Sequence, residues 1–292
     1  MASEPYIGRF APSPTGELHF GSLVTALASY LDARHNQGLW LLRIEDLDPP
    51  RESRRAPKEI MAQLRSCGLE WDREVIYQSS RMASYHAHLK QLSEKEACYP
   101  CTCIRKRTPK VYRGLCSKNT FDSSIEPFAI RVRMDESQVE FRDFYYGFRS
   151  YDSRTEIGDF IIRRKDGLIA YQLAVITDDA LQGVTHIIRG SDLLACTAKQ
   201  IFLAKKLTLA IPSYGHIPVV VDKQGQKLSK QSHAKPIDKN SPLYMLRLAL
   251  MALGQDPQKH ATNTREFLTN AINDWGRHLV PETHYIYLSL IH

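Results

Sequence analysis

The hydrophobic pattern of the N-terminal segment predicts a strand, a stiff loop, a helix and a second strand. Residues 6–10 form a short apolar-leaning run, and the loop after them carries two prolines and a glycine, which restrict its backbone. From residue 21 onward, apolar side chains recur at helical spacing. Residues 39–44 are apolar except for Arg43, which is typical of a buried parallel strand. This order predicts the opening of a doubly wound α/β sheet.

The pattern changes between residues 86 and 170. This stretch holds a cluster of cysteines and two runs with the alternation of short strands, residues 128–133 and 139–142, so we interpret it as an insertion with its own small fold. The sheet pattern resumes near residue 171. A further helix is expected between Pro242, a favourable first residue, and Gly254, a favourable stop.

Composition and charge narrow the class of protein. Of the 292 residues, 43% are hydrophobic and 24% are charged, as in ordinary soluble proteins. No run approaches the ~18–20 apolar residues of a membrane span, and no signal segment is visible at the N-terminus, so we expect a cytoplasmic protein without membrane contact. The net charge of +7 favours a polyanionic partner such as nucleic acid. A solvated surface with a modest excess of lysine and arginine explains it equally well.

The cysteines indicate a metal site. Four of the six fall within nineteen positions, and without an export signal such a cluster favours a metal over disulfides. Cys101, Cys103 and Cys116 supply three sulfurs, and the fourth ligand of a structural Zn²⁺ is either Cys98 or the oxygen of Tyr112. Four cysteines would be the conventional set, and reduced thiols without a metal are the alternative.

Two short segments about 200 residues apart suggest phosphate chemistry. Residues 9–22 read RFAPSPTGELHFGS and residues 227–231 read KLSKQ. A histidine at a helix start, here His19, can reach phosphate and ribose beside free backbone N–H groups, and Gly21 lets a nucleotide approach the backbone. Lysines on a loop suit a migrating pyrophosphate. We expect Lys230 to stabilise the transition state and Lys227 to assist.

Together the two segments resemble the HIGH and KMSKS signatures of class I aminoacyl-tRNA synthetases. The last position of each departs from the consensus, with Ser22 in place of histidine and Gln231 in place of serine. The resemblance implies an ATP site at His19, Gly21, Ser22 and Lys230. A dehydrogenase or a P-loop enzyme is excluded, because neither a G-x-G-x-x-G after the first strand nor a Walker A segment occurs.

Further segments resemble the glutamyl-tRNA synthetase group: residues 43–48 (RIEDLD), residues 186–192 (HIIRGSD), and Tyr171 followed by Asp178-Asp179. The resemblance ends near residue 250, where a full glutamyl-tRNA synthetase continues with an anticodon-binding domain and only about forty residues remain here. Residues 20–22, residues 171–175 and the cysteine pattern resemble the short paralogues, the glutamyl-queuosine tRNA(Asp) synthetases. The short paralogues bind zinc with three cysteines and a tyrosine, so the resemblance implies that Tyr112 is the fourth zinc ligand.

The resemblance implies a fold organised around a split catalytic domain. We expect a Rossmann-like catalytic domain in two parts, with a zinc-bearing insertion, a short C-terminal helical region and no anticodon-binding domain. The expected boundaries are 1–85 and 171–235 for the catalytic domain, 86–170 for the insertion and 236–292 for the C-terminal region.

The residues make chemical sense as a glutamate site. Glutamate carries two carboxylates and an ammonium group, which two arginines and one acid would match. Arg9 and Arg189 fall at strand ends, where open α/β sheets bind ligands, and arginine binds carboxylates bidentately; each alone would be interpreted as a surface ion pair. Glu45 suits the ammonium group. The remaining expected contacts are Tyr171, Ser13 and Ala11, whereas Arg43 is expected to be structural.

The implied reaction has two steps. Glutamate attacks the α-phosphate of ATP in the presence of Mg²⁺, and the activated glutamyl group then passes to RNA. By resemblance the acceptor is the queuosine base in the anticodon of tRNA(Asp), and the enzyme is expected to be a monomer. The alternatives are a truncated glutamyl-tRNA synthetase that charges an acceptor end and a non-catalytic RNA-binding paralogue. The sequence keeps all of the candidate catalytic and glutamate-binding residues together, which argues against a non-catalytic paralogue.

Overall fold

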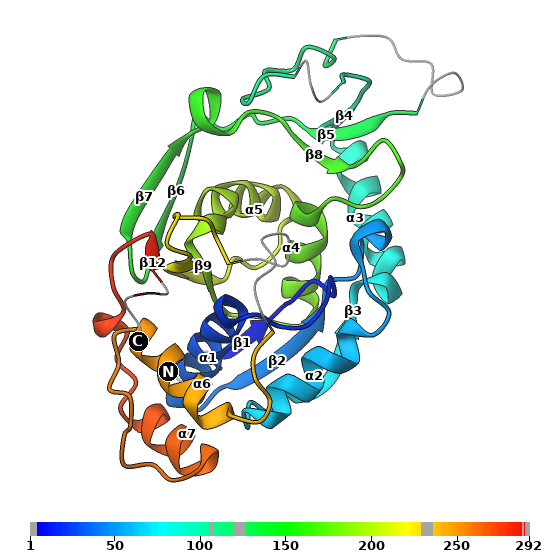
Figure 1. The fold of residues 1–292 in the computed structure, drawn as a ribbon. Coiled ribbons are helices and arrows are strands. Elements are labelled where there is room, and N and C mark those ends of the chain that lie inside the picture. The colour runs from blue at the N-terminus through cyan, green and yellow to red at the C-terminus, as the bar shows by residue number, and fades with distance from the viewer. Residues whose placement is uncertain (1–4, 105–107, 119–126, 229–235, 288, 290–292) are drawn as a thin grey trace.

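The computed structural model describes residues 5–104, 108–118, 127–228, 236–287 and 289. Strands and helices alternate along the N-terminal part, as in an α/β protein (Figure 1). The strands are β1 Ile7–Phe10, β2 Leu39–Ile44, β3 Asp72–Tyr77, β4 Cys98–Cys101, β5 Ala129–Val132, β6 Gln138–Asp143, β7 Gly147–Asp152, β8 Phe160–Arg163, β9 His186–Gly190, β10 Ser213–Ile217, β11 Val219–Val221 and β12 Tyr285–Tyr287. The α-helices are α1 Phe20–His35, α2 Ala56–Ser66, α3 Met82–Glu94, α4 Tyr171–Leu181, α5 Leu194–Leu207, α6 Pro242–Ala252 and α7 Thr264–Asn273.

The first sheet is parallel, with strand order β1-β2-β3. Strands β1 and β2 are buried on both faces, because alternate side chains enter different cores, whereas β3 at the edge is partly exposed. Trp40 and Leu42 of β2 pack in the core that α1 covers, whereas Leu41 packs in the core that α4 and α5 cover. The apolar run 39–44 therefore forms the buried parallel strand that its composition predicts, and the α/β prediction is confirmed.

The second sheet has the order β7-β6-β10-β9. Strand β10 is parallel to both of its neighbours, and β6 and β7 form an antiparallel hairpin. The backbone N–H of Thr185, just before β9, donates to the carbonyl of Ile7 over 2.9 Å, so β9 and β1 lie side by side at the centre of the molecule (Figure 1). The β6–β7 hairpin belongs to residues 86–170, so this stretch also contributes to the second sheet.

A third, antiparallel sheet lies at one end of the molecule (Figure 1). Its order is β4-β5-β8, and it carries the cysteine-rich segment beside it. The runs expected at 128–133 and 139–142 are confirmed as β5 and β6.

The C-terminal helices α6 and α7 pack against α1. Pro242 opens α6 as expected, and Gly254 follows its last turn with φ +70°. A Cβ atom at Gly254 would lie 2.2 Å from the carbonyl oxygen of Leu279, so only glycine fits this stop. The C-terminal region is also fastened by Asp32 of α1, which is fully buried and accepts from Trp275 Nε1 over 2.9 Å and from Arg277 Nε over 2.7 Å. Among the described residues, no helix has both the length and the apolar character to span a membrane.

Candidate active site

A cavity of about 680 Å³ opens where β1, β2 and β9 end and α1 begins. This volume is in the ordinary range for a small-molecule site. The expected glutamate and ATP contacts within the described residues all line it: Arg9, Ala11, Ser13, His19, Gly21, Ser22, Glu45, Tyr171, Arg189 and Lys227. Lys230, expected to act on the phosphates, lies outside the described residues. Side chains from both halves of the chain therefore meet in one cavity.

His19 is the N-cap residue of α1. Its Nδ1 accepts from the backbone N–H of Ser22 over 3.2 Å, and the Ser22 hydroxyl lies 3.1 Å from Nε2. Ser22, which replaces a histidine of the consensus, thus holds the imidazole. A Cβ atom at Gly21 would lie 3.3 Å from that ring, so a side chain there would crowd it. Gly21 and Ser22 of the first turn of α1 line the cavity, and a helix N-terminus is a favourable position for phosphate.

The two signature segments come together through their neighbouring residues. The backbone N–H of Ile237 donates to the carbonyl of Leu18 over 3.0 Å, and Lys239 forms an ion pair with Glu17 at 3.3 Å. Lys227 lies on the cavity wall and pairs with Asp192 at 2.5 Å. This arrangement brings at least one lysine of the second segment to the same cavity as His19.

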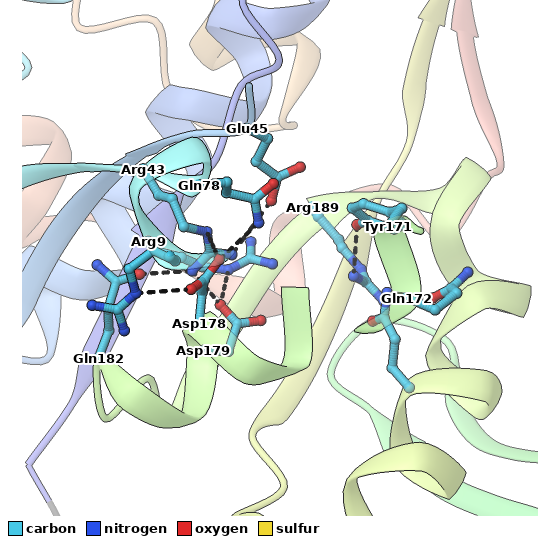
Figure 2. Close-up of polar contacts among 12 residues, drawn as sticks. Arg9, Arg43, Glu45, Gln78, Tyr171, Gln172, Asp178, Asp179, Gln182 and Arg189 are labelled. Carbon is cyan, nitrogen blue, oxygen red and sulfur yellow. Dashed lines mark hydrogen bonds and ion pairs between the residues drawn. The ribbon is translucent and has the colours of Figure 1, made fainter. Parts of the chain in front are cut away.

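Arg9 is held by a buried ion-pair network behind the cavity. Its Nε donates to Asp179 Oδ1 over 3.1 Å, and Arg43 Nη1 lies 2.8 Å from the same oxygen (Figure 2). Arg43 Nη2 lies 3.4 Å from Glu45 Oε1, and Arg43 is fully buried and does not line the cavity. As expected from its place in a buried strand, Arg43 makes ion pairs within the fold. It connects the two candidate glutamate contacts, Arg9 and Glu45.

The same network extends to the start of α3. Asp178 accepts from Gln78 over 2.8 Å and from Tyr85 over 2.7 Å, and it pairs with Arg81 at 3.3 Å. The sequence singled out Asp178-Asp179 only as part of a family motif. An acidic pair in an otherwise apolar helix is the signal that could have identified them as partners of buried arginines.

The two carboxylates nearest Arg43, those of Glu45 and Asp179, have pKa values shifted in opposite directions. Burial raises the pKa of Glu45, and the neighbouring arginines only partly offset this. Burial also acts on Asp179, but there Arg43 and Arg9 prevail and hold its pKa below the usual range. Asp179 therefore remains an anion that fixes the arginines, whereas Glu45 lies on the cavity wall with room for a cationic ligand.

On the other side of the cavity, Arg189 is 3% exposed. Its Nη1 lies 3.4 Å from the Tyr171 hydroxyl (Figure 2), its Nη2 donates to Thr197 Oγ1 over 2.6 Å, and its Nε donates to His216 Nε2 over 3.1 Å. Burial raises the pKa of Tyr171, so the hydroxyl stays a neutral donor. The sequence missed Thr197 and His216; a histidine within the apolar run 214–221 was the available signal.

The cysteine cluster forms a candidate metal centre. The sulfurs of Cys101, Cys103 and Cys116 lie within 4.8 Å of one another. The Tyr112 hydroxyl lies 3.3 Å from Cys103 Sγ and 3.6 Å from Cys101 Sγ. Among the described residues Cys98 is not part of this group and instead packs against the core of α4 and α5. Three convergent thiols could hold a metal ion, and the oxygen of Tyr112 is in position to join them.

Comparisons with known proteins agree with this geometry. A family model described as tRNA synthetases class I (E and Q), catalytic domain, matches residues 7–253. A glutamyl-Q tRNA(Asp) synthetase of Escherichia coli (strain K12) is 44% identical over 288 residues, which cover 97% of this chain and 93% of the relative. A protein of the same name from Pseudomonas fluorescens is 45% identical over 287 residues, covering 96% and 95%.

A solved structure shares the fold. A glutamate tRNA ligase from Elizabethkingia meningosepticum, crystallised with its amino acid, superposes with a TM-score of 0.79 at 24% identity. The superposition covers 96% of this chain and 66% of the ligase, so this chain spans about two thirds of that protein.

Proposed function

The chain belongs to the family of class I tRNA synthetase (E and Q) catalytic domains, and from that premise we propose that it activates L-glutamate with ATP and transfers the glutamyl group to the queuosine base of tRNA(Asp). The observation that carries the proposal is the single cavity shared by the candidate glutamate and ATP contacts. The acceptor follows from the name of the relatives, which match nearly the whole chain. The net charge of +7 is compatible with an RNA partner.

In this proposal the cavity walls supply charges complementary to glutamate. Arg9 and Arg189 bind its carboxylates, Glu45 accepts from its ammonium group, and Tyr171 and Ser13 add hydroxyl donors, with Ala11 beside them. Because both arginines are already fixed by buried partners, they lose little freedom when the ligand binds. A neutral or shorter amino acid would leave one arginine without an anion, which favours glutamate.

Adenylation then proceeds by in-line attack. A carboxylate oxygen of glutamate forms a bond to the α-phosphorus of ATP, the bond from that phosphorus to the bridging oxygen breaks, and pyrophosphate leaves. His19, Gly21 and Ser22 at the start of α1 hold the nucleotide, and Lys227 and Lys230 stabilise the charge on the departing pyrophosphate. Mg²⁺ accompanies ATP as part of the substrate. In the second step a nucleophile of the RNA attacks the glutamyl carbonyl, and AMP leaves.

We further propose that Cys101, Cys103, Cys116 and Tyr112 hold one structural Zn²⁺. Thiolates are preferred zinc ligands, and a fully protein-ligated ion would stabilise the insertion without taking part in the reaction. We also expect a monomer, because every group of the proposed site comes from one chain, and a cytoplasmic location, where its proposed substrates occur together.

The test is glutamate-dependent exchange of label between pyrophosphate and ATP without added tRNA, followed by transfer of labelled glutamate to RNA. We expect exchange with glutamate but not with glutamine, and transfer to tRNA(Asp) that carries queuosine. The matched control is tRNA(Asp) lacking the modification, which should remain unlabelled. Charging of tRNA(Glu) without reaction at tRNA(Asp) would contradict the proposal and favour a synthetase that acts on an acceptor end.

A further inference from the structure

Three adjacent strands carry a line of polar side chains behind the cavity. In the parallel pair β10–β9, His216 lies directly opposite Arg189, and β6 on the other side of β10 ends with Asp143. Both His216 and Asp143 are buried, and neither lines the cavity. Opposed residues of neighbouring strands project from the same face of a sheet, as do residues two apart on one strand. Asp143 is opposite Tyr214, two positions before His216, so the three side chains share one face and meet in the order Asp143, His216, Arg189.

Hydrogen-bond chemistry assigns the tautomer of His216. A guanidinium can only donate, so the contact of 3.1 Å between Arg189 Nε and His216 Nε2 requires an unprotonated Nε2. The ring proton then resides on Nδ1, which donates to Asp143 Oδ2 over 2.6 Å. Thr197 Oγ1, at 3.0 Å from Nε2, is a neutral neighbour. Any other protonation state would place an N–H against the N–H of Arg189.

Asp143 is itself fixed. Its Oδ1 accepts from the backbone N–H groups of Tyr145 over 3.0 Å, Tyr146 over 3.1 Å and His216 over 3.3 Å. Burial lowers the pKa of His216 to about 4, more than the Asp143 carboxylate raises it. The imidazole is therefore neutral at physiological pH, with a single orientation and a single tautomer.

We propose that His216 is a positioning residue for Arg189: its neutral imidazole, oriented by Asp143, accepts the Nε–H and thereby turns the guanidinium so that Nη1 lies beside Tyr171 at the cavity. This inference rests on the proposed function, in which Arg189 binds a carboxylate of glutamate. Asp143 comes from the hairpin within residues 86–170, so this part of the chain contributes to amino-acid recognition through buried hydrogen bonds.

The test compares His216→Leu with His216→Gln in the full-length protein, by steady-state pyrophosphate exchange. Leucine removes the acceptor of a buried charged donor, and we expect the KM for glutamate to rise about tenfold or more while the KM for ATP changes less than about twofold. The glutamine side chain places an amide oxygen near the position of Nε2, so His216→Gln should retain most of the glutamate affinity. His88→Leu is the matched control, because His88 is a half-buried histidine bonded to Thr177 at 2.8 Å, away from the cavity.

A direct measurement of the tautomer separates this inference from the proposed function. Nitrogen chemical shifts of the His216 ring, assigned by comparison with His216→Gln, should report an Nδ1–H imidazole with an unprotonated Nε2 at neutral pH. An Nε2–H imidazole or an imidazolium would overturn the inference, whatever the enzyme catalyses. An unchanged glutamate KM in folded His216→Leu, or equal losses for glutamate and ATP in both variants, would also overturn it. Absence of pyrophosphate exchange in the wild-type protein would count against the proposed function. In that case the measured tautomer of His216 would be the test of this inference.

Discussion

Replacing Asp179 by asparagine should destabilise the fold through its buried arginines. Asp179 accepts from Arg9 and Arg43, and its side chain is only 5% exposed. In the native network three arginines, Arg9, Arg43 and Arg81, face three carboxylates, Glu45, Asp178 and Asp179. Asp179→Asn keeps the shape of the side chain but leaves one buried positive charge uncompensated.

The magnitude follows from what remains around Arg43. Removal of one partner from a buried ion pair costs ~3–5 kcal/mol. Glu45 and Asp178 still lie 3.4 Å and 4.0 Å from Arg43, so we expect the lower end, ~3 kcal/mol. With an unfolding entropy of ~2.1 cal/mol/K per residue, this corresponds to a fall in Tm of roughly 5 °C for the 292-residue chain.

Urea unfolding and calorimetry of both proteins at pH 7 measure the difference in the free energy of unfolding. The matched control is Glu94→Gln, which breaks an exposed ion pair with Lys90 at 3.7 Å and should cost at most ~0.5 kcal/mol. A loss below ~1 kcal/mol for Asp179→Asn would refute the reasoning, because it would mean that the buried arginines do not depend on this carboxylate.

The pH dependence provides a second check with a defined sign. The folded-state pKa of Asp179 is depressed by Arg43 and Arg9 against the opposing effect of burial. Its contribution to stability is therefore fully present above the unfolded value of about 4 and is lost as the pH falls through the lower folded value. The stability difference between wild type and Asp179→Asn should be constant near neutrality and shrink below about pH 4. A difference that grew on acidification would contradict this assignment.

Three further predictions concern the metal, the phosphates and the C-terminal region. Metal analysis should find about one zinc per chain, and Cys116→Ser should lower that content and expose the insertion to proteolysis; full zinc retention would remove this residue from the ligand set. Lys230→Ala should cut pyrophosphate exchange while calorimetric binding of glutamate persists, and unchanged exchange would disprove the role. Asp32→Asn should lower the free energy of unfolding by ~3 kcal/mol, because Arg277 loses its buried partner; a Tm unchanged within 1–2 °C would argue that Asp32 does not fasten the C-terminal region.

The sequence by itself determined the local elements of this protein. Residues 39–44 predicted a strand buried on both sides, and the apolar spacing after the proline-rich loop predicted a helix, because hydrophobic periodicity and turn residues act within a few positions. Many candidate contacts of the cavity were also predictable from motifs, since Arg9, Glu45 and Arg189 lie at strand ends and His19, Gly21 and Ser22 lie at the start of a helix. The roles assigned to them remain predictions.

Only the tertiary structure decided which groups hold these contacts. Asp179 is 170 residues from Arg9, and Asp143 reaches His216 across 73 residues because a hairpin of the inserted stretch joins the second sheet. The cysteine spacing was compatible with both Cys98 and Tyr112, and the family resemblance pointed to Tyr112; the folded chain places its hydroxyl beside the sulfurs of Cys101 and Cys103. Buried charges and polar groups need partners, but local patterns do not encode which distant segment will be adjacent once the strands have paired.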